Sequence, residues 1–250
     1  MFDETLEIHK KRYSEAIRHA HKAGDKQFQD WFNKSESIDQ SILRGFWDFS
    51  IHILTSTIYA AINKPESQTA LEIGYGGGRL LNAAAAYFGN VIGIDIHDER
   101  TAVSDFLTAQ GKTNFQLLRT NGAEIDVPSN SIDFIYSFIV LQHLPNFTTF
   151  ATYMAETARC LKTGGIAQLY FGNLTLLKQF QRWPQAKHGY LEILDVPVNH
   201  ISLLIRPAKV KSICRSVGLQ MKGSGRSYKN APDGFPERIG DQKFITVMKR

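Results

Sequence analysis

A glycine-rich stretch that follows a short apolar run carries the residues best placed to hold a ligand. Gly74, Gly76 and Gly78 alternate with other residues directly after the apolar run 69–73, and a helical pattern begins at once. Glycines permit close approach of the backbone to a bound molecule, and the first turn of a helix offers unpaired amide groups. Glu72, near the end of the run, can accept hydrogen bonds from an ammonium group. The stretch therefore predicts a ligand-binding loop at the junction of a strand and a helix.

Two further positions distinguish this loop from a dinucleotide-binding loop. The dinucleotide fingerprint G-x-G-x-x-G, started at Gly74, requires glycine at position 79, where the chain has Arg79. Asp95 ends the next apolar run, 21 residues after Gly74. A carboxylate in that place can bind both hydroxyl groups of a ribose. The pattern acid-x-G-x-G-x-G, followed by this second acid, therefore favours a ligand that carries an ammonium group and a ribose.

On these residues the sequence resembles the class I S-adenosylmethionine-dependent methyltransferases of the broad type-11-like group, most strongly over residues 68–171. The resemblance implies that the loop wraps the methionine portion of the cofactor, that Asp95 binds ribose and that Asn121 meets the adenine amine. The family often has Asp at this third place, but an amide oxygen also accepts from an amine. Methyl transfer would leave S-adenosylhomocysteine as the product. The implied cofactor-binding residues are Glu72, Gly74, Tyr75, Gly76, Gly78, Asp95, Ile96, Asn121, Gly122 and Ser137.

Methyl transfer requires an acceptor atom held in line with the methyl group and, for a hydroxyl acceptor, a base that takes its proton. His143 follows the expected fourth strand, at the edge of the sheet where this fold places the acceptor. The ordinary pKa of histidine suits a base at neutral pH. The alternative interpretation is a histidine that fixes its own loop by bonding to backbone. The ends of the fourth and fifth strands lack the clustered carboxylates of a magnesium site, so no metal is expected.

Short apolar runs alternate with helical segments from residue 69 onward. This order is typical of parallel strands that are joined by crossover helices. We therefore expect an α/β fold, with a Rossmann-like, mostly parallel sheet of seven strands that is flanked by helices.

The chain divides into a helical N-terminal part and the methyltransferase domain. Residues 1–64 repeat apolar positions every three or four residues, which predicts a helical cap with an aromatic core. Residues 65–250 form the class I methyltransferase domain, in which 172–206 is an insertion on the acceptor side. Because long loops at this edge often cover ligands, we expect the insertion to contact the acceptor, the alternative being only an extra helix and strand. The aromatic residues expected in the core of the cap are Trp31, Phe46 and Trp47, the alternative being that they form a lid over the cofactor.

Charge is distributed unevenly along the chain. The first fifty residues carry 8 basic and 9 acidic side chains, the next hundred 5 and 9, and the last hundred 16 and 6. A positive surface concentrates anionic ligands, so an anionic acceptor and a merely solvated basic face are both compatible with this pattern. The basic residues in question include Arg206, Lys209, Lys211, Arg215, Lys222, Arg226 and Lys229.

The remaining features of the composition limit the compartment and the function classes that the sequence allows. Two cysteines form no disulfide framework or zinc cluster, and no apolar stretch approaches the roughly 20 residues of a membrane helix. A cytoplasmic protein without a membrane span is expected. The leading interpretation is methyl transfer to an oxygen of a small molecule. The alternatives are an RNA or protein methyltransferase that uses the basic C-terminal region, or a non-catalytic S-adenosylmethionine-binding protein. Nucleic acid is the weaker partner because the basic residues lack interleaved aromatic residues.

Overall fold

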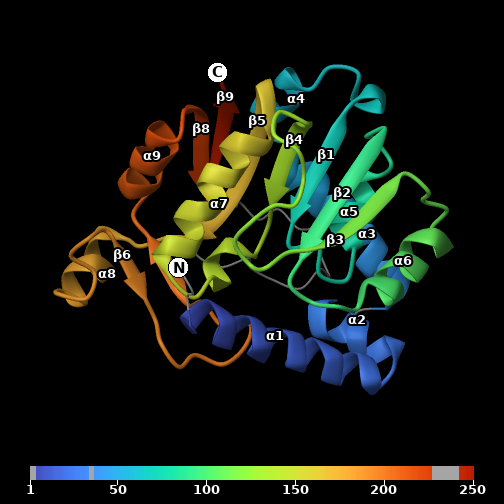
Figure 1. Cartoon of the computed structure of the whole chain (residues 1–250), viewed down its shortest axis with the longest axis horizontal. Coiled ribbons are helices and arrows are strands. Elements are labelled where there is room, and N and C mark those ends of the chain that lie inside the picture. The colour runs from blue at the N-terminus through green and yellow to red at the C-terminus, as the bar shows by residue number, and fades with distance from the viewer. Residues whose placement is uncertain (1–3, 34–36, 227–241) are drawn as a thin grey trace.

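A seven-stranded sheet forms the centre of the computed structural model, which describes residues 4–33, 37–226 and 242–250 (Figure 1). The strand order is β3-β2-β1-β4-β5-β9-β8. Neighbours from β3 to β5 are parallel, whereas β9 runs antiparallel to both β5 and β8. The expected Rossmann-like, mostly parallel sheet is thereby confirmed. The strands are β1 (Thr69–Ile73), β2 (Asn90–Asp95), β3 (Phe115–Arg119), β4 (Ile132–Ser137), β5 (Leu161–Gly172), β8 (Leu219–Arg226) and β9 (Gln242–Lys249).

Helices cover both faces of the sheet, which explains why the central strands read as continuous apolar runs. Phe134 and Tyr136 of β4 point into one apolar cluster and Ile135 into the other, as the alternation of side chains along a strand requires. The first face packs against α5 (Arg79–Ala84) and α6 (Arg100–Ala109), and the second against α7 (Phe147–Cys160) and α9 (Pro207–Ser216).

The helix boundaries follow the sequence signals with one exception. Pro207 opens α9, and Gly218 follows that helix with a φ of +83°. A glycine shortly after a helical segment commonly ends the helix, but Gly164 does not do so here, because α7 ends at Cys160 and β5 begins directly at Leu161. Gly164 instead lies near the start of β5, where the register between β4 and β5 shifts.

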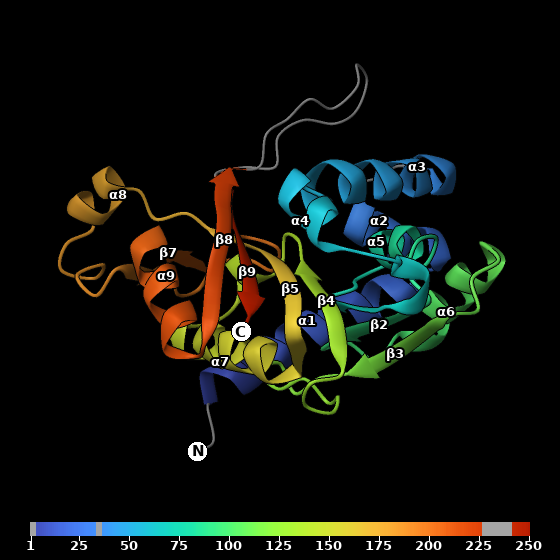
Figure 2. The same ribbon diagram turned by 90° about the horizontal axis from the view of Figure 1, so that it is seen from above.

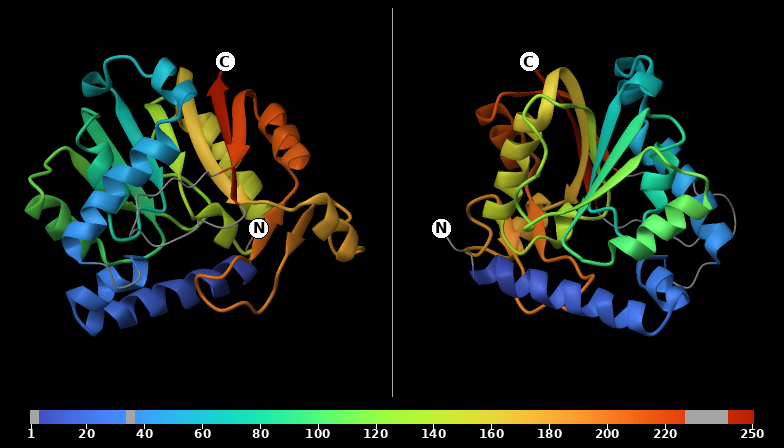
Figure 3. Two further views of the ribbon diagram at one scale, coloured as in Figure 1. Left: turned by 180° about the vertical axis from the view of Figure 1, so that it is seen from behind. Right: turned by 45° about the vertical axis from the view of Figure 1, so that its right-hand side comes forward.

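The N-terminal part is helical, as expected. Its elements are α1 (Glu4–Lys22), α2 (Asp25–Asn33), α3 (Ile38–Asp48), a π-helical turn (Phe49–Ile53) and α4 (Ser56–Ala61). Figures 1 and 3 show α1 and α2 lying along one edge of the sheet. Phe49, Ile53 and Ile58 share an apolar cluster with Ala70 and Tyr136 of the sheet. The division at residue 64 stays a prediction, because the two parts pack into a common core.

The insertion after β5 contains a helix, α8 (Leu176–Gln181), and two antiparallel strands, β6 (Tyr190–Glu192) and β7 (Leu203–Ile205). It has a small core of its own around Leu174, Ala186 and Leu204. Figures 1 and 2 show α8 projecting from the side of the molecule. Within the described part of the chain, no helix is both long and apolar enough to cross a membrane.

Candidate functional site

A cavity of about 450 Å³ lies between the carboxyl ends of the central strands and the N-terminal helices. This volume falls in the range of small-molecule and cofactor sites. The structure brings most of the predicted site residues together here, whereas Gly78, Asn121 and Ser137 lie outside the lining. The predicted residues that line the cavity are Glu72, Gly74, Tyr75, Gly76, Asp95, Ile96, Gly122 and His143.

The glycines of the loop are required by their protein neighbours as well as by any ligand. Gly74 and Gly76 have φ values of +80° and +52°, which residues with a β-carbon adopt at a cost. A β-carbon on Gly74 would collide with Val140, and one on Gly76 would lie 2.9 Å from Cδ1 of Phe32 in α2. The loop is therefore packed tightly between the cap and the segment after β4.

Asp95 and His97 hold this loop by its backbone. Oδ2 of Asp95 accepts a hydrogen bond from the Gly76 amide at 2.8 Å, and Oδ1 accepts from the Ile96 amide at 2.7 Å. His97 is fully buried, and its Nδ1 accepts from the Glu99 amide at 3.2 Å. Nε2 of His97 therefore carries the proton and donates to the Gly76 carbonyl at 3.1 Å. His97 was not foreseen, because a lone histidine after a strand carries no sequence signal for this role.

Glu72 is a buried carboxyl group at the centre of the cavity lining. Its Oε2 accepts a hydrogen bond from the Tyr136 hydroxyl at 3.0 Å. Burial raises the pKa of Glu72 to about 8, while the Tyr136 hydrogen bond and the charge of Arg79 act in the opposite direction. Arg79 itself forms an ion pair with Asp48 of α3, and both residues line the cavity. A cationic group that enters the cavity would favour the ionised form of Glu72.

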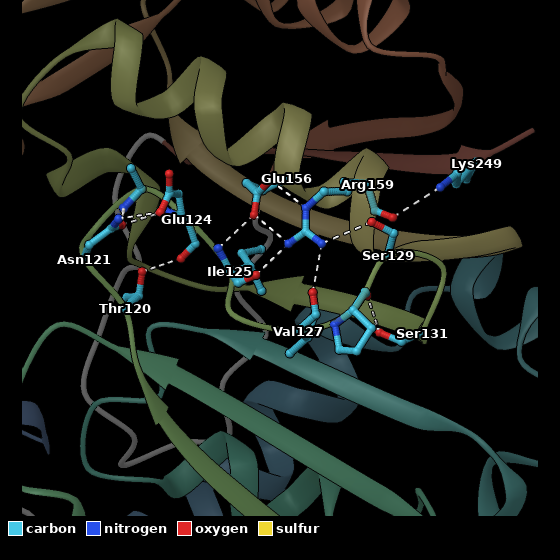
Figure 4. Close-up of polar contacts among 12 residues, drawn as sticks. Thr120, Asn121, Glu124, Ile125, Val127, Ser129, Ser131, Glu156, Arg159 and Lys249 are labelled. Carbon is cyan, nitrogen blue, oxygen red and sulfur yellow. Dashed lines mark hydrogen bonds and ion pairs between the residues drawn. The ribbon is translucent and has the colours of Figure 1, made fainter. Parts of the chain in front are cut away.

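Asn121 is occupied within its own turn. Its Oδ1 accepts from the amides of Ala123 and Glu124 at 3.0 and 2.9 Å, and its Nδ2 donates to Oε2 of Glu124 at 2.7 Å (Figure 4). The side chain is exposed, while Thr120 and Gly122 on either side line the cavity. Asn121 thus shapes the loop, as short amide side chains commonly do in turns.

The loop after β3 is fixed by Arg159 of α7 (Figure 4). Nη2 of Arg159 donates to the Ile125 carbonyl at 2.6 Å, and Nη1 donates to the Val127 carbonyl at 2.8 Å. Both carboxylate oxygens of Glu156 accept from the same guanidinium at 2.8 Å. Hydrogen bonding to Arg159 lowers the pKa of Glu156. This network connects α7 to the loop that contains the cavity-lining residues Thr120 and Gly122.

Ser137 joins two strands and stays out of the cavity. Its side chain is fully buried, and Oγ donates to the Ile73 carbonyl at 3.0 Å. The bond links the ends of β4 and β1, directly beneath the glycine loop.

His143 presents one ring nitrogen without a proton. Nδ1 lies 2.8 Å from the carbonyl oxygen of His200, which can only accept, so Nδ1 carries the proton. Burial lowers the pKa of His143, which keeps the ring neutral and leaves Nε2 as an acceptor. Nε2 of His143 accepts a hydrogen bond from the side-chain Nε2 of Gln142 at 3.1 Å. Oε1 of Gln142 is buried with no hydrogen-bond partner in the described structure. The ring therefore fixes the segment around His200 and also faces the cavity.

The N-terminal helices roof the cavity. Arg12 of α1 donates to the Val196 carbonyl at 2.9 Å, and the Tyr13 hydroxyl accepts from the Asn199 amide at 3.0 Å. These bonds fasten α1 to the insertion, of which Asn199 and Ile201 reach the lining. Further lining residues from the N-terminal helices are Leu6, His9, Lys10, Tyr13, Ile17, Phe32, Arg44, Asp48 and His52.

The expectation that Trp31, Phe46 and Trp47 form the core of the cap holds in part. Trp31 and Phe46 are partly buried and pack against the apolar core, while Trp31 and Trp47 also line the cavity. The spacing of aromatic residues identifies the inner face of a helix, and this face abuts a cavity as well as a core.

Comparison with known proteins agrees with this geometry. Residues 71–169 match a family described as "Methyltransferase domain". A ubiquinone biosynthesis O-methyltransferase of Hydrogenovibrio crunogenus is 25% identical over 217 residues, covering 78% of this chain and 87% of that protein. The protein of the same name from Paramagnetospirillum magneticum is 28% identical over 176 residues, covering 69% and 68%.

Solved structures share the fold at lower identity. An S-adenosylmethionine-dependent methyltransferase of Methanosarcina mazei has a TM-score of 0.57 at 16% identity and covers 78% of this chain and 98% of its own. One from Mesorhizobium loti has a TM-score of 0.57 at 12% identity and covers 76% and 95%. The domain match and the curated relatives support a class I S-adenosylmethionine-dependent methyltransferase, and the solved structures share its fold.

Proposed function

We propose that the protein transfers a methyl group to a hydroxyl oxygen of a small molecule, with His143 as the base. The observation that carries the proposal is the unprotonated Nε2 of a neutral histidine at the cavity, at the end of β4. The names of the curated relatives support oxygen as the acceptor atom.

The cavity fits the cofactor by the chemistry of its lining. Glu72 supplies a carboxylate for an ammonium group, and Asp95 supplies one beside the loop for ribose hydroxyls. The Tyr75 hydroxyl is buried with no hydrogen-bond partner among the described residues, which leaves it free to bind a ligand. The bound sulfonium supplies an already activated methyl group. Glu72, Asp95 and the glycine loop would therefore bind and orient, while Thr120 and Gly122 border the remaining part of the site.

His143 would accept the proton that the hydroxyl loses as the methyl group is transferred. The His200 carbonyl holds the ring by Nδ1, so Nε2 keeps its orientation when the Gln142 amide gives way to the acceptor. Oε1 of Gln142, which lacks a partner among the described residues, could accept a second hydrogen bond from the acceptor. Because burial lowers the pKa of His143, the basic form is available throughout the neutral range.

The N-terminal roof would exclude water during transfer. Trp31, Trp47 and Phe138 provide apolar lining, and α1 closes the cavity through its bonds to the insertion. A water-poor site strengthens the electrostatic interactions within it and prevents side reactions of the activated cofactor. The acceptor must enter before this closure or through an opening of α1.

The positions of the basic residues bear on whether the acceptor is anionic. Arg206, Lys209, Lys211 and the other described basic residues named above, on α9 and β8, do not line the cavity, and Lys229 lies outside the described residues. Of the lysines and arginines that the structure describes, Lys10, Arg44 and Arg79 reach the lining. The proposal that an anionic acceptor docks against the basic C-terminal region therefore gains no support from their position.

The test is detection of a methylated product by mass spectrometry after incubation with S-adenosylmethionine and hydroxylated small molecules. His143→Ala should lower kcat by about a hundredfold to ten-thousandfold, the usual contribution of a general base, and added imidazole should restore part of the loss. The affinity for S-adenosylhomocysteine should stay unchanged. His19→Ala, which removes an exposed imidazole from α1, is the matched control.

The dependence on pH provides a second readout. The kcat of the parent should be level through the neutral range and fall only below the ordinary histidine value of 6.5, because burial lowers the pKa of His143. A His143→Ala variant with parental kcat, or products methylated only on nitrogen or carbon, would contradict the proposal.

A further inference from the structure

The insertion exposes large apolar side chains next to cations. Leu176, Leu177, Phe180 and Trp183 lie on α8 and the turn that follows it, and all four are exposed. Phe180 is 82% exposed and Trp183 is 60% exposed. Figures 1 and 2 agree that α8 stands away from the sheet, at the edge of the molecule. We call these four residues, with the cations described below, the α8 surface.

The insertion buries smaller apolar side chains and exposes larger ones. Its small core buries Leu174 and Ala186, whereas the larger Phe180 and Trp183 point outward. Single exposed apolar residues are ordinary on protein surfaces, but several large ones within one short segment point to an interaction site. The fold of the insertion itself leaves these side chains without partners.

The charged side chains of this segment are all basic. Lys178, Arg182 and Lys187 are exposed, and no Asp or Glu occurs from Asn173 to Leu191. These cations contribute to the basic excess of the last hundred residues, and none of them lines the cavity. The surface therefore combines apolar bulk with a net charge of one sign.

We propose that the α8 surface binds the protein to the surface of an anionic lipid bilayer. Lys and Arg beside Leu, Phe and Trp form the composition of segments that lie in the membrane interface, where apolar residues enter the acyl boundary and cations stay at the headgroups. Trp in particular favours the interface between lipid and water. Each exposed cation near an anionic surface strengthens binding by about fivefold, and each large apolar residue that enters the bilayer by roughly tenfold.

Charge also argues against a second copy of the chain as the occupant. Two α8 surfaces brought face to face would each present Lys178, Arg182 and Lys187 without any acidic residue of the segment to compensate. Like charges in apposition disfavour such contact. An anionic bilayer supplies both the missing negative charge and the apolar phase.

The experiment is co-sedimentation of the full chain with vesicles of equimolar phosphatidylcholine and phosphatidylglycerol, compared with vesicles of phosphatidylcholine alone. The parent should partition at least tenfold more strongly onto the anionic vesicles, and high salt should weaken that binding. Leu177→Ser/Phe180→Ser should reduce binding by about a hundredfold. Lys178→Glu/Arg182→Glu should remove the preference for anionic lipid.

Matched controls distinguish this surface from general stickiness. Leu43→Ser/Tyr59→Ser removes two equally exposed apolar residues from the N-terminal helices, and Lys22→Glu/Lys26→Glu reverses two exposed cations there. Both controls should bind vesicles as the parent does. Circular dichroism and binding of S-adenosylhomocysteine verify that each variant is folded. Failure of the parent to bind anionic vesicles, parental binding by both α8 variants, or a dimer of the parent that Leu177→Ser/Phe180→Ser abolishes would overturn the proposal.

Discussion

If Glu72 binds the cofactor as proposed, its buried carboxyl group should make that binding dependent on pH. Burial raises the pKa of Glu72 to about 8, so in the cofactor-free protein at pH 7 this group is mostly protonated and neutral. The proposed role of Glu72, pairing with the ammonium group of the cofactor, requires the ionised form. Binding should therefore release a proton from Glu72, and Glu72→Gln should abolish that release.

The size of the effect follows from the fraction of Glu72 that is ionised. With a pKa of about 8, that fraction is roughly one in a hundred at pH 6 and about one in eleven at pH 7. The affinity should then rise about ninefold between pH 6 and pH 7, a range in which the amino group of the ligand stays charged. At pH 7 binding should release about 0.9 of a proton.

Isothermal titration with S-adenosylhomocysteine, in buffers that differ in ionisation enthalpy, measures both quantities. Glu72→Gln should show weaker binding that no longer varies over this range, whereas Glu66→Gln, a change at an exposed carboxyl group, should keep the parental slope. The reasoning is refuted if the parent binds with constant affinity and no proton release. It is equally refuted if Glu72→Gln keeps the ninefold rise.

The same shift determines how the stability of the cofactor-free protein depends on pH. The pKa of Glu72 in the folded chain, about 8, exceeds the ordinary value of 4.5, so the folded state holds more protons than the unfolded state between these values. Stability therefore falls as pH rises through that window. The thermal midpoint of the Glu72→Gln variant should therefore decline less with rising pH in this window than that of the parent.

Four other substitutions test the loop and the roof. Asp95→Ala should weaken binding of S-adenosylhomocysteine by about 1.5–3 kcal/mol in titration calorimetry, and a folded variant with parental affinity would place the site elsewhere. Gly76→Val should abolish measurable binding, because a branched residue adopts the required positive φ poorly; retained affinity would contradict the loop geometry. Arg159→Ala should lower the free energy of unfolding in urea by about 1.5–3 kcal/mol, and an unchanged urea midpoint would show that the loop after β3 is stable without the hydrogen bonds of Arg159. Tyr13→Phe should raise the dissociation rate of S-adenosylhomocysteine by about two- to tenfold in stopped-flow measurements, and an unchanged rate would exclude α1 as a closing element.

The sheet and the centre of the site could be predicted from sequence because both depend on local pattern. The acid and the glycines of the loop sit in consecutive positions, and Asp95 ends the next strand, so parallel pairing alone brings them together. The reason given for the glycines was incomplete. Gly74 and Gly76 leave space for Val140 and Phe32 as well as for a ligand, and those contacts join segments that are far apart in sequence.

The rest of the site depends on tertiary packing that local pattern does not encode. The polar residues His9, Lys10 and Tyr13 on α1 read as the solvated face of a helix, and only its crossing of the strand ends turns them into cavity lining. The side chain of Asn121 was expected to meet adenine. The backbone amides of its own turn compete for the same oxygen, and in the structure they occupy it.

The distribution of charge separates binding at the cavity from association with other surfaces. Lys10, Arg44 and Arg79 line the cavity, where partial burial limits screening by salt, whereas Lys178 and Arg182 are exposed on α8. Raising the ionic strength should therefore release the protein from anionic vesicles while cofactor affinity barely changes. A charge excess counted along a sequence is dominated by exposed side chains, so it reports on association with surfaces more directly than on the charge of a substrate. The charge that an acceptor meets depends on the cations that reach the cavity, and among the described residues these come from α1, α3 and the start of α5 rather than from α9 and β8.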